Sequence, residues 1–270
     1  MSYKMIGIPG GMGSYTEIDL MKKIYNIHGA TTDQNQIPIN VLSIPHKIVD
    51  RTEFLLGRTK TNPGIAISEI VSTLISNGAE VIGIPCNTAH VASIFNLVKK
   101  NIPPHCKLIN MIEEVGLYIS RYHPGIKLVG VLSTTGTANS KVYPDMLGKF
   151  KIKVIQPSAD IQKRLVHPAI YDRDYGIKSY ANPIKEQARN NLVTAAGLLI
   201  QEGAQAIIMG CTEIPLAFTE EKIEGRLLID TTYILASALV RDACNKNIID
   251  ITKSQRLAKA NINDINSTCA

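Results

Sequence analysis

The sequence predicts an α/β protein built from two similar halves, each with a doubly wound parallel sheet. Two observations predict this class. Short apolar runs alternate with longer amphipathic stretches, and a segment of the first half recurs in the second half. Strands that alternate with helices form βαβ units and therefore parallel sheets. A chain of 270 residues is long enough for two such halves.

The expected strands are short apolar or β-branched runs. They lie at residues 5–8, 39–44, 81–84, 107–110, 128–133, 153–156, 206–210 and 227–230. Helices are expected between them, among others at 64–77, 89–100, 184–202 and 231–245. Short strands alternating with longer helical segments are typical of parallel α/β sheets.

A repeat relates the two halves. The stretch NGAEVIGIPCNTAHV at 77–91 resembles EGAQAIIMGCTEIPL at 202–216, and in each copy a glycine precedes a cysteine by eight positions. Two more pairs follow at a similar offset: GIPGGMGS at 7–14 with GVLSTTGT at 130–137, and LINM at 108–111 with LIDT at 228–231. Three matches in one order indicate two α/β halves of one design. We expect one domain from 1–110 plus 231–250, a second from 111–230, and an appended tail at 251–270.

The composition argues against several classes of function. The net charge is +6, but Lys and Arg are scattered without a cluster of five or more, so no nucleic-acid partner is predicted. No apolar run is long enough to span a bilayer and no secretory signal is evident, so we expect a cytoplasmic protein without a membrane partner. The five cysteines lack CxxC spacing, which argues against a disulfide framework and a zinc site.

Cys86 and Cys211 are the candidate catalytic residues. Each ends an expected strand, and ligands of open parallel sheets bind at the carboxyl ends of strands. The residues that follow can begin a helix: Asn87 and Thr88, and Thr212 and Glu213. A helix N-terminus stabilises a thiolate and binds carboxylates, so we expect lowered pKa values for both thiols. If the two halves face each other, the thiols approach one ligand from opposite sides. The alternative is that both cysteines only fill the core.

Four motifs resemble those of one enzyme family: PCNTAH at 85–90, GCTEIPL at 210–216, GGMG at 10–13 and DRT at 50–52. With them the chain is similar to the aspartate/glutamate racemase superfamily, and specifically to its aspartate racemase branch, from Gly7 to about Leu239. Glu213 favours that branch, because glutamate racemases carry a histidine after the second Cys-Thr pair.

The resemblance implies a cofactor-independent enzyme with two α/β domains related by a pseudo-twofold and an active site in the cleft between them. One cysteine, as a thiolate, removes the α-proton of the amino acid, and the other, as a thiol, returns a proton to the opposite face. The resemblance gives these roles to Cys86 and Cys211, requires neither pyridoxal phosphate nor a metal, and implies a homodimer. Which cysteine acts on which enantiomer stays open.

Substrate contacts implied by the resemblance come from loops at strand ends. They are Gly11, Met12, Gly13, Asn87, Thr88, Thr134, Thr135, Thr137, Thr212 and Glu213. Arg51 and Lys178 match the cations that bind a side-chain carboxylate, to which arginine can form two parallel hydrogen bonds and lysine offers a point charge. Without the resemblance, both cations would be interpreted as solvated surface charges. The loop at 10–13 fits neither the dinucleotide nor the P-loop pattern.

The sequence therefore predicts a racemase that interconverts L- and D-aspartate. Glutamate, or a broader set of amino acids, remains open as the substrate. A decarboxylase of the superfamily is expected to lack one cysteine, so the presence of both argues against it. The alternative from another class is a protein that binds an acidic metabolite without catalysis, which thermal stabilisation by the ligand without turnover would indicate.

Overall fold

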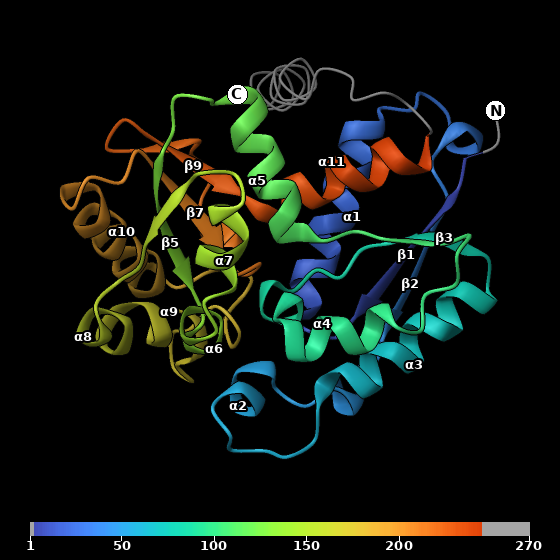
Figure 1. The fold of residues 1–270 in the computed structure, drawn as a ribbon, viewed down its shortest axis with the longest axis horizontal. Coiled ribbons are helices and arrows are strands. Elements are labelled where there is room, and N and C mark those ends of the chain that lie inside the picture. The colour runs from blue at the N-terminus through green and yellow to red at the C-terminus, as the bar shows by residue number, and fades with distance from the viewer. Residues whose placement is uncertain (1–2, 245–270) are drawn as a thin grey trace.

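The computed structural model describes residues 3–244, which form two sheets flanked by helices (Figure 1). The strands are β1 (Met5–Gly10), β2 (Ile39–Ser43), β3 (Ala79–Ile82), β4 (Lys107–Leu108), β5 (Leu128–Ser133), β6 (Lys153–Ile155), β7 (Ala206–Gly210), β8 (Lys222–Ile223) and β9 (Arg226–Asp230). All pairings are parallel except that of β8 with β9. The predicted α/β class with parallel sheets is confirmed, and each of the eight expected strands overlaps an observed one.

The helices vary widely in length. The α-helices are α1 (Ser14–His28), α2 (Arg51–Leu55), α3 (Pro63–Ser76), α4 (Ala92–Lys99), α5 (Met111–Tyr122), α6 (Thr135–Asn139), α7 (Val142–Gly148), α8 (Ala159–Ile161), α9 (His167–Tyr171), α10 (Glu186–Gln201) and α11 (Thr231–Ala243). Single turns of 3₁₀-helix are η1 (Asp33–Asn35), η2 (Pro45–Lys47), η3 (Asn87–His90) and η5 (Ile214–Ala217), and η4 (Gln162–Val166) is a π-helical turn.

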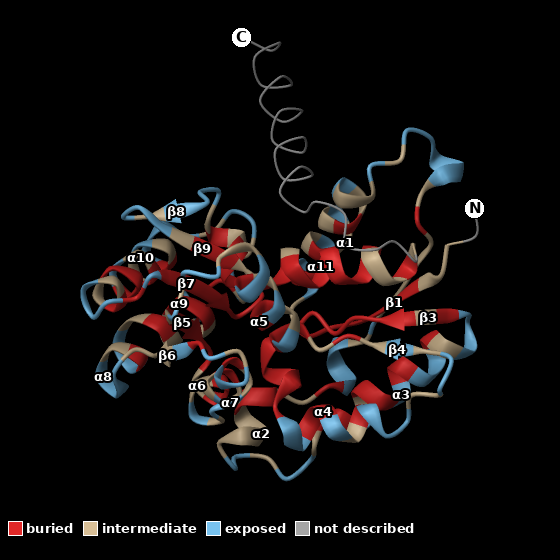
Figure 2. Cartoon of the chain, turned by 45° about the horizontal axis from the view of Figure 1, so that its top comes forward, coloured by how far each residue is buried: buried red, intermediate tan, exposed pale blue. Residues whose placement is uncertain are grey.

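Each sheet is buried on both faces, because helices pack on either side (Figure 2). On the first sheet α1 and α11 cover one face and α3 and α4 the other. On the second sheet α5 and α7 cover one face and α9 and α10 the other. The packed core residues include Leu20, Leu239, Ile67, Ile94, Val115, Leu147, Ile170 and Leu192. Burial of each such side chain contributes roughly 1.5–3 kcal/mol to the free energy of folding. The cores therefore hold the strand ends in place.

The two sheets share one strand order. The first runs β2-β1-β3-β4, and the second runs β6-β5-β7-β9 with β8 added at its edge. In this correspondence β3 is equivalent to β7. Cys86 lies four residues beyond the end of β3, and Cys211 directly follows β7. The two cysteines therefore follow equivalent strands. The pseudo-twofold between the halves stays a prediction.

Capping side chains fix where several helices begin, and so where site residues lie. Asp50 accepts hydrogen bonds from the backbone N–H groups of Thr52 (2.8 Å) and Glu53 (3.0 Å), and α2 therefore begins at Arg51. Thr134 caps α6 by accepting from the N–H of Thr137. An N-cap of this kind contributes about 1 kcal/mol to helix stability.

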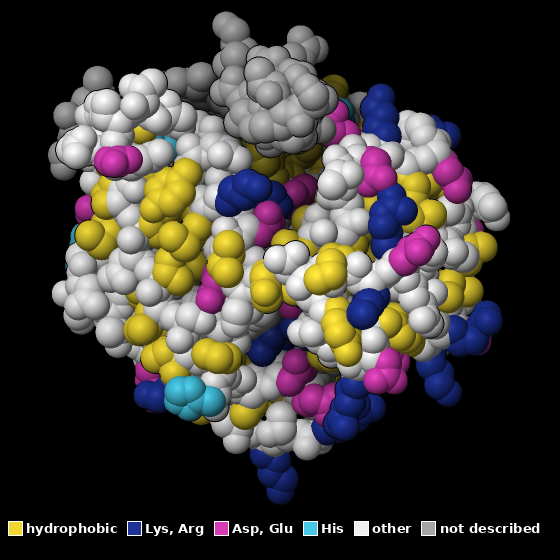
Figure 3. All heavy atoms as spheres, turned by 180° about the vertical axis from the view of Figure 1, so that it is seen from behind, with side chains coloured by type: hydrophobic (Ala, Val, Ile, Leu, Met, Phe, Trp, Pro, Cys, Tyr) yellow, Lys and Arg dark blue, Asp and Glu magenta, His cyan; other side chains and the backbone are white. Residues whose placement is uncertain are grey.

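The last described helix returns to the first sheet. α11 packs on α1 and contributes Leu235 and Leu239 to the core that contains Ile6 and Ile8 of β1. The domain bounds expected from the sequence stay a prediction, and residues 245–250 and the tail at 251–270 lie outside the described residues. No helix within residues 3–244 is long and apolar enough to cross a membrane. On the face shown in Figure 3, basic and acidic side chains are interspersed.

Candidate active site

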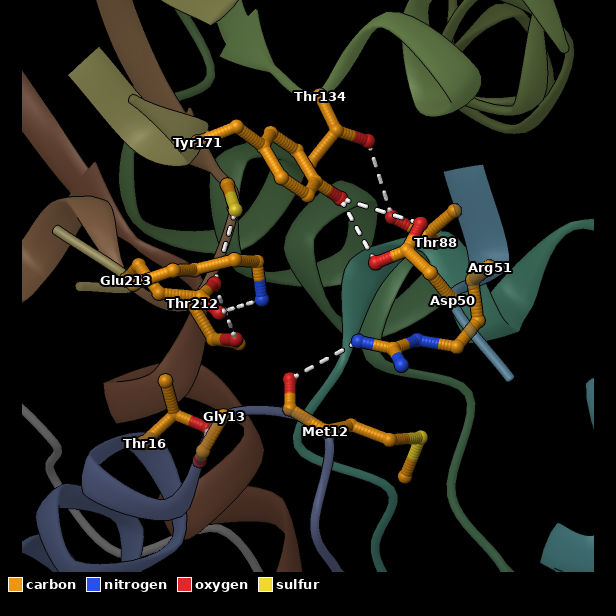
Figure 4. Close-up of polar contacts among 12 residues, drawn as sticks. Met12, Gly13, Thr16, Asp50, Arg51, Thr88, Thr134, Tyr171, Thr212 and Glu213 are labelled. Carbon is orange, nitrogen blue, oxygen red and sulfur yellow. Dashed lines mark hydrogen bonds and ion pairs between the residues drawn. The ribbon is translucent and has the colours of Figure 1, made fainter. Parts of the chain in front are cut away.

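The candidate site lies at the carboxyl ends of strands from both sheets. The loop after β1 supplies Met12 and Gly13, the segment after β3 supplies Cys86, and the segments after β5 and β7 supply Thr134 and Cys211. Figure 4 shows Arg51 and Glu213 on opposite sides of this site, with Tyr171 and Thr134 at one end and Met12 and Gly13 at the other. Both cysteines are buried, with 5% of Cys86 and 4% of Cys211 exposed.

Arg51 is the buried cation on the Cys86 side. Its Nη2 donates to the carbonyl oxygen of Met12 (3.2 Å), and its buried Nε has no hydrogen-bond partner among residues 3–244. Burial opposes the charge of the guanidinium, but Cys86 and Asp50 nevertheless raise the pKa of Arg51.

Cys211 has an anion as its partner instead. Its Sγ donates to Oε2 of Glu213 (2.9 Å), and Oε1 of the same carboxylate forms an ion pair with Nζ of Lys178. Burial raises the pKa of the Cys211 thiol, and the negative charge of Glu213 raises it further. Burial also opposes the charge of Glu213, but Lys178 holds the pKa of this carboxyl below its usual value. The two cysteines therefore lie in environments of opposite charge.

The two cysteine segments are joined directly. The hydroxyl of Thr212, next to Cys211, donates to the carbonyl oxygen of Pro85, next to Cys86 (3.2 Å). The loop after β1 also lies close to the Cys211 segment, since a Cβ atom on Gly13 would lie 2.7 Å from Oε1 of Glu213. A side chain at position 13 would thus collide with the Glu213 carboxylate. Three segments that are distant in sequence converge here.

Three predicted threonines form a second link across the site. Thr88 Oγ1 lies 3.1 Å from Thr134 Oγ1 and 2.8 Å from Thr137 Oγ1, and the latter two oxygens are 3.0 Å apart. All three side chains are buried. Each hydroxyl can donate and accept, so the triangle satisfies its own members while it joins η3 to α6.

Three other predicted residues have their polar groups occupied elsewhere. The side-chain oxygen of Asn87 accepts from the hydroxyl of Tyr143 (2.6 Å), and its nitrogen donates to Thr231 (3.2 Å). Thr135 is bonded to the ring of His167 (3.2 Å), away from the threonine triangle. The N–H of Gly11 donates to the buried carboxylate of Glu17 (2.7 Å). Their substrate contacts stay predictions.

Tyr171, which no motif reveals, also lies at the site, where it contacts two residues of the DRT motif. The hydroxyl of Tyr171 lies 3.3 Å from Oδ2 of Asp50 and 3.1 Å from Oγ1 of Thr52, and Nζ of Lys178 lies 5.5 Å from the centre of the Tyr171 ring. Burial, with the nearby charge of Asp50, raises the pKa of Tyr171, which therefore remains a neutral phenol. Asp50 is adjacent to Arg51 in the DRT motif and could be found from it, whereas Tyr171 has no local signal.

The expectation of lowered thiol pKa values is wrong for Cys211. It assumed that a helix begins directly after the cysteine, but only the four-residue turn η5 follows, and it begins at Ile214. A single 3₁₀ turn has little aligned dipole to oppose the cost of burying a charge, and Glu213 adds a negative charge. The pKa of Cys211 is raised well above its ordinary value as a result.

The residues described have no cluster of three or more His, Cys, Asp or Glu side chains that could hold a metal ion.

Known proteins resemble the chain over most of its length. A family model described as Asp/Glu/Hydantoin racemase matches residues 10–239. The solved structure of an aspartate racemase from Picrophilus torridus has a TM-score of 0.74 at 26% identity, covering 93% of this chain and 98% of that one. That of an aspartate racemase homologue from Pyrococcus horikoshii OT3 has a TM-score of 0.68 at 22% identity, covering 89% and 99%.

Among curated sequences, a glutamate racemase from Roseiflexus sp. (strain RS-1) is 27% identical over 208 residues, which are 73% of this chain and 65% of that protein. The chain thus spans less than two thirds of the length of this relative. The family model, by contrast, includes both cysteines, the glycine-rich loop, Arg51 and Lys178 within its matched range. This chain belongs to the Asp/Glu/Hydantoin racemase family.

Proposed function

We propose that the protein interconverts L- and D-aspartate by moving the α-proton between Cys86 and Cys211, without pyridoxal phosphate. The observation that carries this proposal is the pair of buried cysteines after equivalent strands, with their segments joined by the hydrogen bond from Thr212 to Pro85. Inversion at a carbon atom requires one proton-transfer group on each face, and two thiols in one site provide them.

The charges of the site support a dicarboxylic amino acid as the substrate. Arg51 and Lys178 are cationic and Glu213 is anionic, which complements the two carboxylates and one ammonium of aspartate. The free Nε of Arg51 is available to a carboxylate. A buried guanidinium beside the α-carboxylate would also stabilise the negative charge that develops when the α-proton leaves.

The likeness to an aspartate racemase at 26% identity and a TM-score of 0.74 favours aspartate. Glutamate is the second candidate, favoured by the 27% identity to a glutamate racemase. The family resemblance also implies a homodimer, and the cytoplasmic location expected from the sequence stays a prediction.

Incubation of the protein with L-aspartate in heavy water tests the reaction. We expect D-aspartate that carries deuterium at the α-carbon, measured by chiral chromatography with mass spectrometry, and slower turnover in a parallel incubation with L-glutamate. Faster turnover of glutamate would overturn the substrate assignment but not the chemistry. A protein that is thermally stabilised by aspartate and incorporates no deuterium into any amino acid would be a binding protein instead.

Substitution of each cysteine tests the two-base assignment. Cys86→Ser and Cys211→Ser should each lower the rate of racemisation by at least about 100-fold, because a serine hydroxyl cannot replace the thiol in proton transfer. Cys106→Ser is the matched control, since Cys106 lies outside the site and its Sγ donates to the carbonyl oxygen of Ala79 (3.4 Å). Full activity in either active-site variant would refute the assignment.

A further inference from the structure

The carboxylate of Glu213 connects one of the two thiols to a cation. Oε2 accepts from Cys211 Sγ (2.9 Å) and lies 3.4 Å from Thr212 Oγ1, while Oε1 is paired with Lys178. Both oxygens are thus engaged, and 5% of the Glu213 side chain is exposed. Gly13 leaves the space that this carboxylate occupies, because a Cβ atom at position 13 would lie 2.7 Å from Oε1.

The contact between Cys211 and Glu213 requires a proton. A thiolate and a carboxylate at 2.9 Å in a buried site would repel each other strongly, because water does not screen their charges there. One proton between them converts this repulsion into an S–H to carboxylate hydrogen bond. Lys178 stabilises Glu213 as a carboxylate, so the proton stays on sulfur.

The other groups around Cys211 do not reverse this preference. Tyr143 from α7 and Tyr171 from α9 interact with Cys211, and burial raises the pKa of both phenols, so neither supplies a positive charge. Lys178 is the cation that acts on Cys211, but its ammonium is already paired with Glu213. Arg51 also acts on Glu213 and favours its ionised form. Cys86, in contrast, interacts with Arg51.

We propose that Glu213 is the partner that holds the proton on Cys211 in the free protein. Glu213 acts through the sulfur to which it is bonded and is therefore a positioning residue of the site. The protonation state concerns the free protein, whereas its meaning for catalysis rests on the function proposed above.

One turnover that starts from the Cys211 thiol and a Cys86 thiolate balances its protons as follows. The α-C–H bond breaks and its proton passes to the Cys86 sulfur, while the S–H bond of Cys211 breaks and its proton passes to the opposite face of the α-carbon. The product leaves a Cys211 thiolate beside Glu213 and a Cys86 thiol. Return to the starting state requires Cys211 to gain one proton and Cys86 to lose one, with water as the donor and acceptor. The two enantiomers have equal free energies, so kcat/KM is equal in both directions and cannot test the inference.

Alkylation by iodoacetamide over a pH series tests the protonation state directly, because the thiolate is the reacting form. Peptide mass spectrometry gives the rate at each cysteine, and the midpoint of its pH profile is independent of access. In the wild-type protein we expect Cys211 to react with a midpoint at least about one pH unit above that of Cys86. In Glu213→Gln, the Cys211 midpoint should fall by at least about one unit.

Two internal references accompany this measurement. Cys106, which is partly exposed, should react alike in every variant. Glu220→Gln removes a carboxylate from an exposed ion pair with Arg189 and should leave the Cys211 profile unchanged. An unchanged Cys211 midpoint in Glu213→Gln overturns the proposal, and so does a wild-type protein in which Cys211 reacts at the lower pH, a result that remains decisive if the variant does not fold.

Labelling requires no turnover, so this inference and the proposed function can fail separately. If the alkylation midpoints of Cys86 and Cys211 differ as expected but the protein racemises no amino acid, the role of Glu213 stands and the proposed function is wrong. If the two midpoints are equal in an active racemase, the proposed function stands and the role of Glu213 is wrong.

Discussion

At the scale of single residues, the two cysteines differ in the charge of their partners. Cys86 interacts with the guanidinium of Arg51, and Cys211 donates to the carboxylate of Glu213. Both sulfurs are almost fully buried, so each partner acts with little screening by water. Arg51 at the start of α2 and Glu213 just after Cys211 thus place two equivalent strand ends beside charges of opposite sign.

His90 makes stability depend on pH. It is buried, its Nδ1 is bonded to the carbonyl oxygen of Cys86 (2.9 Å), and burial lowers its pKa to about 4. The unfolded chain binds a proton at His90 near pH 6.5, whereas the folded chain binds it near pH 4. The stabilisation from neutral His90 is therefore complete above pH 6.5 and is lost as the pH falls toward 4. At pH 5 this loss amounts to about 2 kcal/mol.

Urea unfolding at pH 7.5 and pH 5.0 measures this effect. In His90→Gln the difference in unfolding free energy between the two pH values should be smaller than in the wild-type protein by about 2 kcal/mol. His105→Gln, which changes an exposed histidine, serves as the control. Equal pH dependence in the His90 variant and the wild type would show that the pKa of His90 is the same in the folded and the unfolded chain.

The sequence identifies site residues where they belong to a motif. Arg51 and Glu213 are found because each lies in a short string beside other polar residues. Tyr171 and Tyr143 could not be predicted as site residues, because each lies far along the chain from its partner. Tyr171 is 119 residues from Thr52, and Tyr143 is 56 residues from Asn87. The raised pKa of Cys211 could not be predicted from the sequence either. It depends on burial and on the charge of Glu213, the neighbour that is paired with Lys178.

At the scale of elements, the loop between β1 and α1 is shaped by glycine. Gly11 has φ 89° and Gly13 has φ 127°, both in the region that L side chains rarely adopt. The backbone at Gly11 passes so close to Pro45 that a Cβ atom would lie 2.7 Å from its nitrogen. The loop can therefore approach both Pro45 and Glu213 only because these positions lack side chains.

Gly13→Ala should impair the site more than the fold. The new methyl group would press on Oε1 of Glu213 and displace it from Lys178 or Cys211. We expect the racemisation rate to fall at least about tenfold, equivalent to about 1.4 kcal/mol of transition-state stabilisation. Gly29→Ala is the matched control, because Gly29 ends the same helix at φ 67° with its nearest atom 4.0 Å away.

Both substitutions place alanine at positive φ and should lower stability by similar amounts, about 1–3 kcal/mol. Thermal unfolding and initial rates of D-aspartate formation separate the two effects. A Gly13→Ala protein that is as active as Gly29→Ala would show that the loop is not part of the reacting site.

Elements with a clear period or apolar run could be predicted, and short ones could not. The sequence places α3, α10 and α11 to within a few residues, because each has an apolar face that spans several turns. By contrast, α6 and α9 have five residues each and show no complete period. Their positions depend on tertiary contacts, such as those of Thr134 and Thr137 with Thr88.

At the scale of the whole molecule, the site is closed by contacts between the segments of the two sheets. Thr88 bonds to Thr134 and Thr137, Thr212 to Pro85, and Asn87 to Tyr143. Both cysteines are almost fully buried, with 5% of Cys86 and 4% of Cys211 exposed. These contacts therefore join the segments that carry the two cysteines.

At Gly136 the backbone of α6 lies close to that of α2. A Cβ atom at this position would lie 2.9 Å from Cα of Thr52, and backbone cannot move aside as a flexible side chain can. Gly136→Ala must therefore push α6 away from α2, which carries Arg51 at its first position. Overpacking of this kind typically costs about 1–3 kcal/mol.

The expected result of Gly136→Ala is a displaced Arg51 in a protein whose two sheets remain intact. We expect kcat/KM for aspartate to fall at least about tenfold, a loss of about 1.4 kcal/mol. Gly148→Ala is the control, because this glycine ends the nearby helix α7 and a Cβ atom there meets nothing within 4 Å. Initial rates over a range of aspartate concentrations, with circular dichroism as the measure of folding, check the pair. If the two variants have the same initial rates and the same circular dichroism, the approach of α6 to α2 does not set the geometry of the site. That geometry must then depend on the threonine contacts and the Thr212–Pro85 bond.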